Sequence, residues 1–247
     1  MLTKGSDHMA YRIYLSASTQ KDNIGVEQYG TEQDRMQQLA DRIKYYLDTQ
    51  NKKFVVFRNM PGWSLYQTVD ECNQLACEIF IDCHSNAGSS GADGTEVYFH
   101  EGSTKGKILA EKLYQRIAPI SPGIDRGVFS DFTLYPDSGL YVLAKTIPPA
   151  ALVEFFYHSN SAEVKHYLGN IDIYAKSAAM AICDYFGEKW IEAPISINKA
   201  MDILTIAKII NSPELWNRLS QDGIQTVEGA IIRQLLLNMA QFLQYTK

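Results

Sequence analysis

The sequence has little of what marks a membrane-spanning protein or a nucleic-acid-binding protein. No window approaches the roughly 18 to 20 uninterrupted apolar residues that a spanning helix needs. The N-terminus shows no charged-then-apolar secretory pattern. Basic residues are not in excess, because the formal net charge is −5, and no concentrated basic face is present to bind a phosphate backbone. We therefore expect no transmembrane segment and no nucleic acid partner.

Cysteine is also scarce, with four residues in 247. Their spacing fits no paired metal-knuckle pattern, and Cys83 alternates with apolar residues in an apparent strand. We expect buried free thiols at all four positions, which are Cys72, Cys77, Cys83 and Cys183.

The chain does have enough apolar residues, 46%, to bury the core of one large domain or of one domain plus an appendage. Its first nine residues, MLTKGSDHM, are typical of a vector remnant, so the interpretation begins at residue 10. Short β-branched and aromatic runs predict strands, and amphipathic segments between them predict helices. The predicted strands are Tyr11–Ser16, Lys53–Arg58, Cys77–Cys83, Thr95–His100, Leu140–Ala144 and Ala151–Tyr157, and the predicted helices begin at Thr31, Ser64, Ser103 and Asp172.

This alternation predicts an α/β fold with a mostly parallel twisted sheet covered by helices on both faces. After Trp190 the pattern changes, because EAPIS reads as a linker and the rest is helical without strand signals. We predict a first domain over residues 10–189 and a small C-terminal helical bundle over 195–247. The bundle would pack on the first domain or on another copy of itself, for example as a homodimer through the apolar face of AIIRQLLLNMAQFL.

Three polar residues fall where parallel strands end and chemistry gathers. His84 follows an apolar strand, Glu32 opens the helix after the first strand region, and Glu154 lies inside the apolar run LVEFFYHSN. A histidine, a carboxylate and one further ligand would satisfy a catalytic zinc, with a neighbouring carboxylate as general base. Each residue also has a structural interpretation: His84 as a hydrogen-bonded core residue, and Glu32 as a complement to its helix dipole. Glu154 is the strongest functional candidate, because a buried charge requires compensation.

The other histidines resemble surface or loop residues without a partner at ligand spacing, and we leave out His100, His158 and His166. No serine-nucleophile elbow is present, and no cysteine has a recognisable partner histidine. The loop Ser130–Gly139 and the turn after His100 are candidate groove walls, but we favour ordinary loop chemistry as the explanation of both.

The motifs YGTEQDRM, IDCHSNA, GTEVYF, DRGV and PPAALVEFFYHSN, in this order, resemble the zinc-dependent N-acetylmuramoyl-L-alanine amidases of the amidase 3 type. These include clostridial phage endolysins and cell-wall amidases, and the resemblance covers roughly Ala10 to Phe186. It implies that Glu32 and His84 bind Zn²⁺ and that Glu154 polarises water and passes a proton to the leaving amine. The implied reaction is hydrolysis of the amide between N-acetylmuramic acid and L-alanine in peptidoglycan, at the bacterial cell wall. For the zinc amidase catalytic domain over residues 10–189, the resemblance also implies that the bundle over 195–247 serves cell-wall targeting, with oligomerisation as the alternative. The sequence does not indicate an export route.

One departure concerns the first histidine ligand of the family, which usually sits in a DPGHG-like turn. This chain has LSASTQ there, with Thr19 at the histidine position. Gln20 follows it and is our predicted third metal ligand, ahead of Asp22, which is chemically the better donor but lies further along the loop. Two functions therefore stay open: a zinc amidase that cuts peptidoglycan, and a metal-poor, inactive relative that only binds it.

Overall fold

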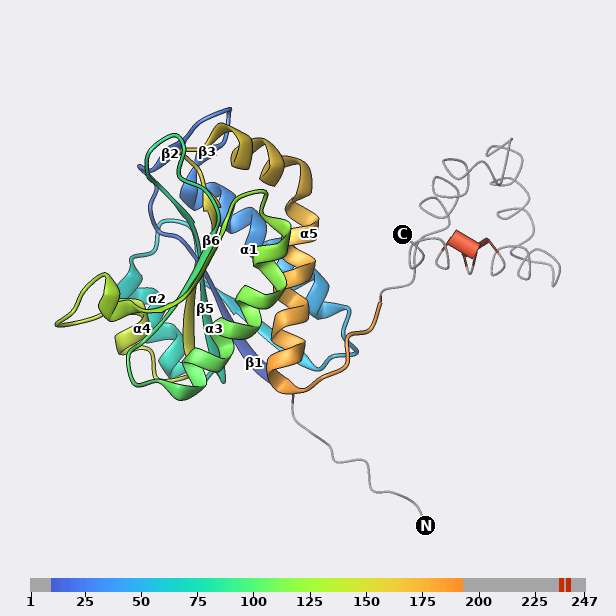
Figure 1. Ribbon diagram of the computed structural model, residues 1–247. Helices are drawn as coiled ribbons and strands as arrows, with labels where there is room; N and C mark the ends of the chain where they lie inside the picture. Colours follow the sequence, from blue (N-terminus) through green and yellow to red (C-terminus); the bar gives the residue numbers. More distant parts are fainter. Residues whose placement is uncertain (1–9, 193–235, 238, 241–247) are drawn as a thin grey trace, which may run out of the picture. The chain divides into compact units, whose positions relative to one another are not determined.

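The computed structural model describes residues 10–192, 236, 237, 239 and 240 of the 247-residue chain. The chain divides into two compact units, Met1–Ile191 and Glu192–Lys247. The fold described here is that of the first unit (Figure 1). The predicted bundle at 195–247 lies outside the described residues, apart from those four positions, so its structure and roles stay predictions. Within the described residues, no helix combines the length and apolar content needed to cross a membrane.

The first unit is built on one six-stranded sheet. Its strands are β1 (Tyr11–Ala17), β4 (Phe54–Arg58), β5 (Ile79–Asn86), β6 (Thr95–Phe99), β7 (Asp125–Ser130) and β8 (Ala150–Tyr157), in the order β4-β1-β5-β8-β6-β7. The pairings are parallel except for β6 with β8. A separate small hairpin joins β2 (Ile24–Gly25) and β3 (Gly30–Thr31). The predicted mostly parallel α/β fold is confirmed.

Helices cover both faces of this sheet (Figure 1). Three pack on one face, namely α1 (Glu32–Asp48), α3 (Thr104–Ile117) and α5 (Ser161–Phe186). The other face carries α2 (Leu65–Gln74) and the short α4 (Tyr141–Lys145). Two 3-10 turns, Ala118–Ile120 and Asp131–Thr133, complete the regular structure of residues 10–192. All four cysteines are free and buried, as expected.

Helix α1 forms where the sequence predicts it. The Thr31 side chain accepts a hydrogen bond from the Asp34 amide and caps the helix, and Glu32 and Asp34 lie in its first turn. One face of α1 is buried in the core through Met36, Leu39, Ala40, Ile43 and Leu47. This capping and packing fix the position of Glu32 at the start of the helix.

Alternation along the central strands assigns side chains to the two faces. Ile79, Ile81 and Cys83 of β5 belong to the core under α1, α3 and α5, whereas Phe80 belongs to the core under α2 and α4. Successive strand residues point to opposite faces, so Asp82 and His84 share the α2/α4 face. Each apolar side chain that is fully buried contributes about 1.5 to 3 kcal/mol, so a one-residue slip is strongly disfavoured.

Two sequence predictions about elements are wrong in detail, and one strand has no counterpart among the predictions. The segment Leu140–Ala144 is not a strand: residues Tyr141–Lys145 form helix α4, because a short apolar run has no periodicity that distinguishes the two. Strand β7 was not predicted as a strand, although its DRGV motif was noted. Helix α5 begins at Ser161 instead of Asp172, since Asn160 caps it and the chain continues through a kink at Asn170.

Candidate active site

The carboxyl ends of β1, β5 and β8 bring the candidate residues together. His84 lies in register with Glu154 on the neighbouring strand β8, and Ser16 of β1 lies in register with Asp82. The Glu32 carboxylate reaches the same place from the N-terminus of α1, where its Oε1 is 2.8 Å from Nδ1 of His84. The structure therefore brings Glu32, His84 and Glu154 to one edge of the sheet.

Glu32 is buried, with 1% of its surface exposed. Its Oε2 accepts a 2.9 Å hydrogen bond from the Asn23 amide, and its Oε1 accepts a long one, 3.4 Å, from the backbone amide of Ser85. Burial raises the pKa of Glu32, but the hydrogen bond and charge of His84 and the bond from Asn23 lower it further, so the net pKa lies below its ordinary value. Glu32 is thus held as a carboxylate, the form that binds metal.

His84 is enclosed between two carboxylates. Its Nε2 is 3.1 Å from Oδ2 of Asp82, and its Nδ1 faces Glu32. Burial lowers the pKa of His84, but the charge and hydrogen bond of Asp82 and the bond to Glu32 outweigh it, so its pKa is raised well above the ordinary value. Without a metal ion, the imidazole therefore carries both protons and donates to both carboxylates.

Gln20 approaches the same ring nitrogen as Glu32. The nitrogen of its side-chain amide, Nε2, is 3.4 Å from Nδ1 of His84, and its Oε1 accepts a 2.5 Å hydrogen bond from Asn23. The loop that carries Gln20 is anchored at its base, because the Asn59 side chain exchanges two 2.8 Å hydrogen bonds with the backbone of Ala17. Asp22, the second-ranked donor, is exposed.

Glu154 provides an unpaired acid beside this cluster. The residue as a whole is half-buried, but its Oε2 atom is enclosed and has no hydrogen-bond partner among the described residues. Burial raises the pKa of Glu154 to about 8, and the charges of Glu32, Glu96 and Asp82 act in the same direction, against the opposing charge of His84. A buried acid with a pKa near neutrality is suited to accept and return a proton.

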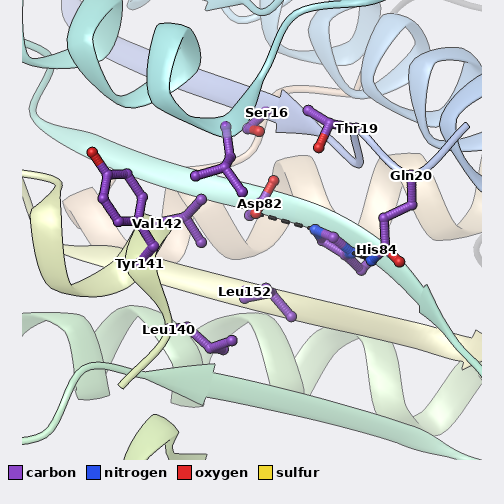
Figure 2. Close-up of a pocket in the computed structure, with 10 residues that line it drawn as sticks. Ser16, Thr19, Gln20, Asp82, His84, Leu140, Tyr141, Val142 and Leu152 are labelled. Carbon is purple, nitrogen blue, oxygen red and sulfur yellow. Dashed lines mark hydrogen bonds and ion pairs between the residues drawn. The ribbon is translucent and has the colours of Figure 1, made fainter. Parts of the chain in front are cut away.

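The pocket beside His84 has a volume of about 220 Å³. Figure 2 shows Gln20 and Asp82 at opposite ends of the His84 ring, with Leu152 and helix α4 on the other side of the pocket. The lining residues are Ser16, Thr19, Gln20, Leu65, Asp82, His84, Leu140, Tyr141, Val142 and Leu152. A polar side with ionisable groups thus faces an apolar wall from α2, α4 and β8, an arrangement typical of small-molecule and substrate sites.

The donor set is suited to a weakly held divalent ion. Among residues 10–192 and the four other described positions, no group of three or more histidine, cysteine or acidic side chains is arranged as a complete metal site. However, Glu32 and His84 are in contact, and Nε2 of the Gln20 amide lies 3.4 Å from the same imidazole nitrogen. Turning this amide over would direct its oxygen, the atom that can bind a metal ion, to that side of the ring. One carboxylate, one imidazole and one amide are compatible with zinc, although an amide is a weaker donor than a second histidine.

Several other sequence expectations need correction. His158 is not a surface residue: it is 4% exposed and its Nδ1 lies 3.0 Å from the Ser85 hydroxyl. His100 does have a partner, Asp131, at 2.9 Å. The loop Ser130–Gly139 does not line the pocket at His84, because that wall starts at Leu140.

Asp82 is the site residue that sequence reasoning missed. It lies within the quoted motif IDCHSNA, two residues before His84, and that spacing on a strand places both side chains on one face. The two-residue spacing between Asp82 and His84 is the sequence signal that identifies Asp82 as a neighbour of the histidine.

Comparison with known proteins adds a family and a fold. The sequence profile of a family described as N-acetylmuramoyl-L-alanine amidase matches residues 13–184. The uncharacterized protein YqiI of Bacillus subtilis (strain 168) is 28% identical over 122 residues, which are 48% of this chain and 54% of that protein. The match thus spans about half the length of that relative.

Solved structures share the architecture. The catalytic domain of CwlV, an N-acetylmuramoyl-L-alanine amidase from Bacillus (Paenibacillus) polymyxa var. colistinus, superposes with a TM-score of 0.64 at 23% identity, covering 72% of this chain and 99% of that one. An N-acetylmuramoyl-L-alanine amidase from Clostridium difficile 630 gives 0.64 at 20% identity, with 74% and 100% covered. The catalytic domain of the CD27L endolysin, which targets Clostridium difficile, gives 0.58 at 19% identity, with 75% and 100% covered. At these identities the likeness shows the fold.

Proposed function

The chain belongs to the N-acetylmuramoyl-L-alanine amidase family, and from this premise we propose that it hydrolyses the amide between N-acetylmuramic acid and L-alanine in peptidoglycan, with Zn²⁺ as cofactor. The observation that carries the proposal is the contact between Glu32 and His84, beside an acid whose enclosed Oε2 atom has no hydrogen-bond partner among the described residues. The site of action would be the bacterial cell wall.

Glu32, His84 and Gln20 would hold the zinc, with His84 binding through Nδ1 after that nitrogen releases its proton. When bound there, the ion would supply Lewis-acid chemistry, polarising the scissile carbonyl and lowering the pKa of water. Glu154 takes a proton from the attacking water as the new C–O bond forms. It then delivers that proton to the amide nitrogen as the C–N bond breaks, so the products are a muramic acid carboxylate and a free L-alanine amine.

The test measures new L-alanine N-termini released from purified peptidoglycan, together with bound zinc. We expect Glu154→Gln to lower turnover by about 10²- to 10⁴-fold while zinc stays bound. Glu71→Gln is the matched control, because Glu71 is a carboxylate on α2 that bonds the Tyr14 hydroxyl outside the pocket. Retained turnover in Glu154→Gln would remove this residue from the chemistry.

A second candidate is a metal-poor, inactive relative that binds peptidoglycan. It is favoured by Thr19, which occupies the position of the family's first histidine, and by the lack of a complete metal cluster in the part of the chain that the structure describes. Zinc analysis, and L-alanine release measured before and after chelation, distinguish the two functions. Release that stops on chelation supports the amidase. If the purified protein contains no zinc and binds cell walls without releasing L-alanine N-termini, the second function is correct.

We also propose that residues 10–189 are the catalytic domain and that residues 195–247 serve cell-wall targeting, with oligomerisation as the alternative. The full chain and a chain that ends at Ile191 would be compared in two assays, sedimentation with purified walls and light scattering. Loss of wall binding in the shorter chain indicates targeting. Loss of a dimer, with wall binding intact, indicates oligomerisation.

A further inference from the structure

Asp82 lies beside the metal-binding residues and has no role in the function proposed above. It is 3% exposed, on β5, and its Oδ2 is 3.1 Å from Nε2 of His84. Because the two residues are separated by one position on the strand, their side chains lie next to each other on the α2/α4 face (Figure 2).

The two nitrogens of the His84 ring have different surroundings. Nδ1 faces both candidate co-ligands, with Glu32 Oε1 at 2.8 Å and Nε2 of the Gln20 amide at 3.4 Å. Nε2 faces Asp82. A carboxylate can only accept a hydrogen bond, so the nitrogen next to Asp82 must carry a proton. The lone pair that can bind a metal ion is then the one on Nδ1.

We propose that Asp82 is a positioning residue that accepts the Nε2 proton of His84 and so fixes the ring with Nδ1 directed at Glu32 and Gln20. The inference rests on the zinc site proposed above. Histidines that ligate a metal generally donate their other N–H to a carboxylate or carbonyl, and this contact sets the tautomer and increases the ligand's basicity. In this chain the contact compensates in part for the amide of Gln20, which is a weaker donor than a histidine.

The alternative role for Asp82 is direct ligation. Asp82 approaches the ring from the Nε2 side, whereas Glu32 and Gln20 approach from the Nδ1 side. A single ion cannot bond both nitrogens of one imidazole, so an ion bound by Asp82 and Nε2 would leave Glu32 and Gln20 without a role. The geometry therefore favours ligation at Nδ1.

The first measurement is zinc affinity, by competition with a chromogenic chelator. We expect Asp82→Ala to weaken zinc binding by about 10- to 100-fold at unchanged stoichiometry. Asp82→Asn keeps an acceptor oxygen of the same shape, and we expect a loss of less than about 10-fold. Glu71→Gln removes one negative charge outside the pocket and should bind zinc like the wild type. Circular dichroism checks that every variant is folded. If Asp82→Ala is not folded, the affinity of Asp82→Asn still tests the proposal.

The second measurement is nitrogen NMR of the zinc-loaded protein with labelled histidine, which a purely structural role would not alter. We expect one histidine with zinc on Nδ1 and a slowly exchanging proton on Nε2, and faster exchange of that proton in Asp82→Ala. Zinc on Nε2 would overturn the proposal in favour of direct ligation. Equal loss of affinity in Asp82→Asn and Asp82→Ala would assign the effect to charge alone, and would also overturn it.

Failure of the inference and failure of the proposed function give different results. If the wild type binds no zinc, the metal site itself is absent, and both proposals are wrong. If the wild type binds zinc and releases L-alanine N-termini, but Asp82→Ala binds zinc equally well, only the role of Asp82 is wrong.

Discussion

Replacing Glu154 with glutamine should stabilise the metal-free protein, and the gain should increase with pH. The enclosed carboxylate faces His84, Glu32, Glu96 and Asp82, and its burial raises the pKa of Glu154 to about 8. Glutamine has nearly the same shape but no charge. The difference between the two proteins therefore isolates the free energy of ionising this acid inside the fold.

The sign follows from the direction of the shift. Below the unfolded-state pKa of 4.5, Glu154 is neutral in both states, and the variant and wild type should respond alike to pH. As pH rises, the unfolded chain ionises first, and the wild-type fold loses stability until the pH passes about 8. The Glu154→Gln variant keeps its stability over this pH range. The difference in unfolding free energy between variant and wild type therefore grows from about pH 4.5 to about pH 8 and then levels off.

The magnitude follows from the size of the shift. A pKa moved from 4.5 to about 8 corresponds to roughly 5 kcal/mol, at about 1.36 kcal/mol per pKa unit. Because the residue as a whole is half-buried, we treat that figure as an upper limit and expect about 2 to 3 kcal/mol. For a chain of this size the gain corresponds to a rise in Tm of roughly 4 to 12 °C above pH 8.

The assay is thermal and urea unfolding of both proteins at several pH values from 4 to 9, in the presence of a chelator. Adding zinc provides the control, because a cation near the carboxylate favours its charged form and should flatten the pH dependence. A difference that stays constant from pH 4 to 9 in the chelated proteins would refute the reasoning, since it would mean that Glu154 is not an enclosed acid.

The remaining predictions concern the metal, a helix cap and the thiols. Thr19→His restores an imidazole where the family has one, so it should tighten zinc binding at least about 10-fold in the chelator competition; unchanged affinity would show that this position does not reach the ion. Asn160→Ala removes the side chain that caps α5 by accepting hydrogen bonds from the amides of Ala162 and Glu163. It should lower the unfolding free energy measured in urea by about 1 to 2 kcal/mol. An unfolding free energy equal to that of the wild type would contradict the capping role. The four buried thiols should react with a chromogenic disulfide only slowly in the native protein and completely in denaturant, and fast native reaction of any one would show that it is exposed.

Much of the fold could be predicted from local pattern. Five of the six predicted strands and the start of α1 are present, because β-branched alternation and a capped amphipathic run are local signals. The segment Leu140–Ala144 could not be resolved that way, since Tyr141–Lys145 form the short helix α4, which packs against α2. The start of α5 at Ser161 could not be predicted either. The helix contains non-helical backbone at Asn170, and only the structure shows that the segments on both sides of this kink form one helix.

The sequence by itself determined which chemical groups the site has. A histidine after a strand, an acid at a helix start and an acid inside an apolar run are visible without coordinates, as is the missing first histidine. Their ionisation could not be read from the sequence, because a pKa depends on burial and on charges brought near from other elements. The pKa of Glu154 is raised to about 8 and the pKa of Glu32 is lowered, although both are carboxylic acids at the same edge of the sheet.

Only the tertiary structure decided that Glu32 and Asp82 lie at different nitrogens of one imidazole. Glu32 is far from His84 in the sequence and reaches it because α1 packs beside the ends of parallel strands. The sequence specifies which side chains can donate to a metal ion. The distances between those side chains arise only when elements far apart in the sequence pack together, and metal binding depends on these distances.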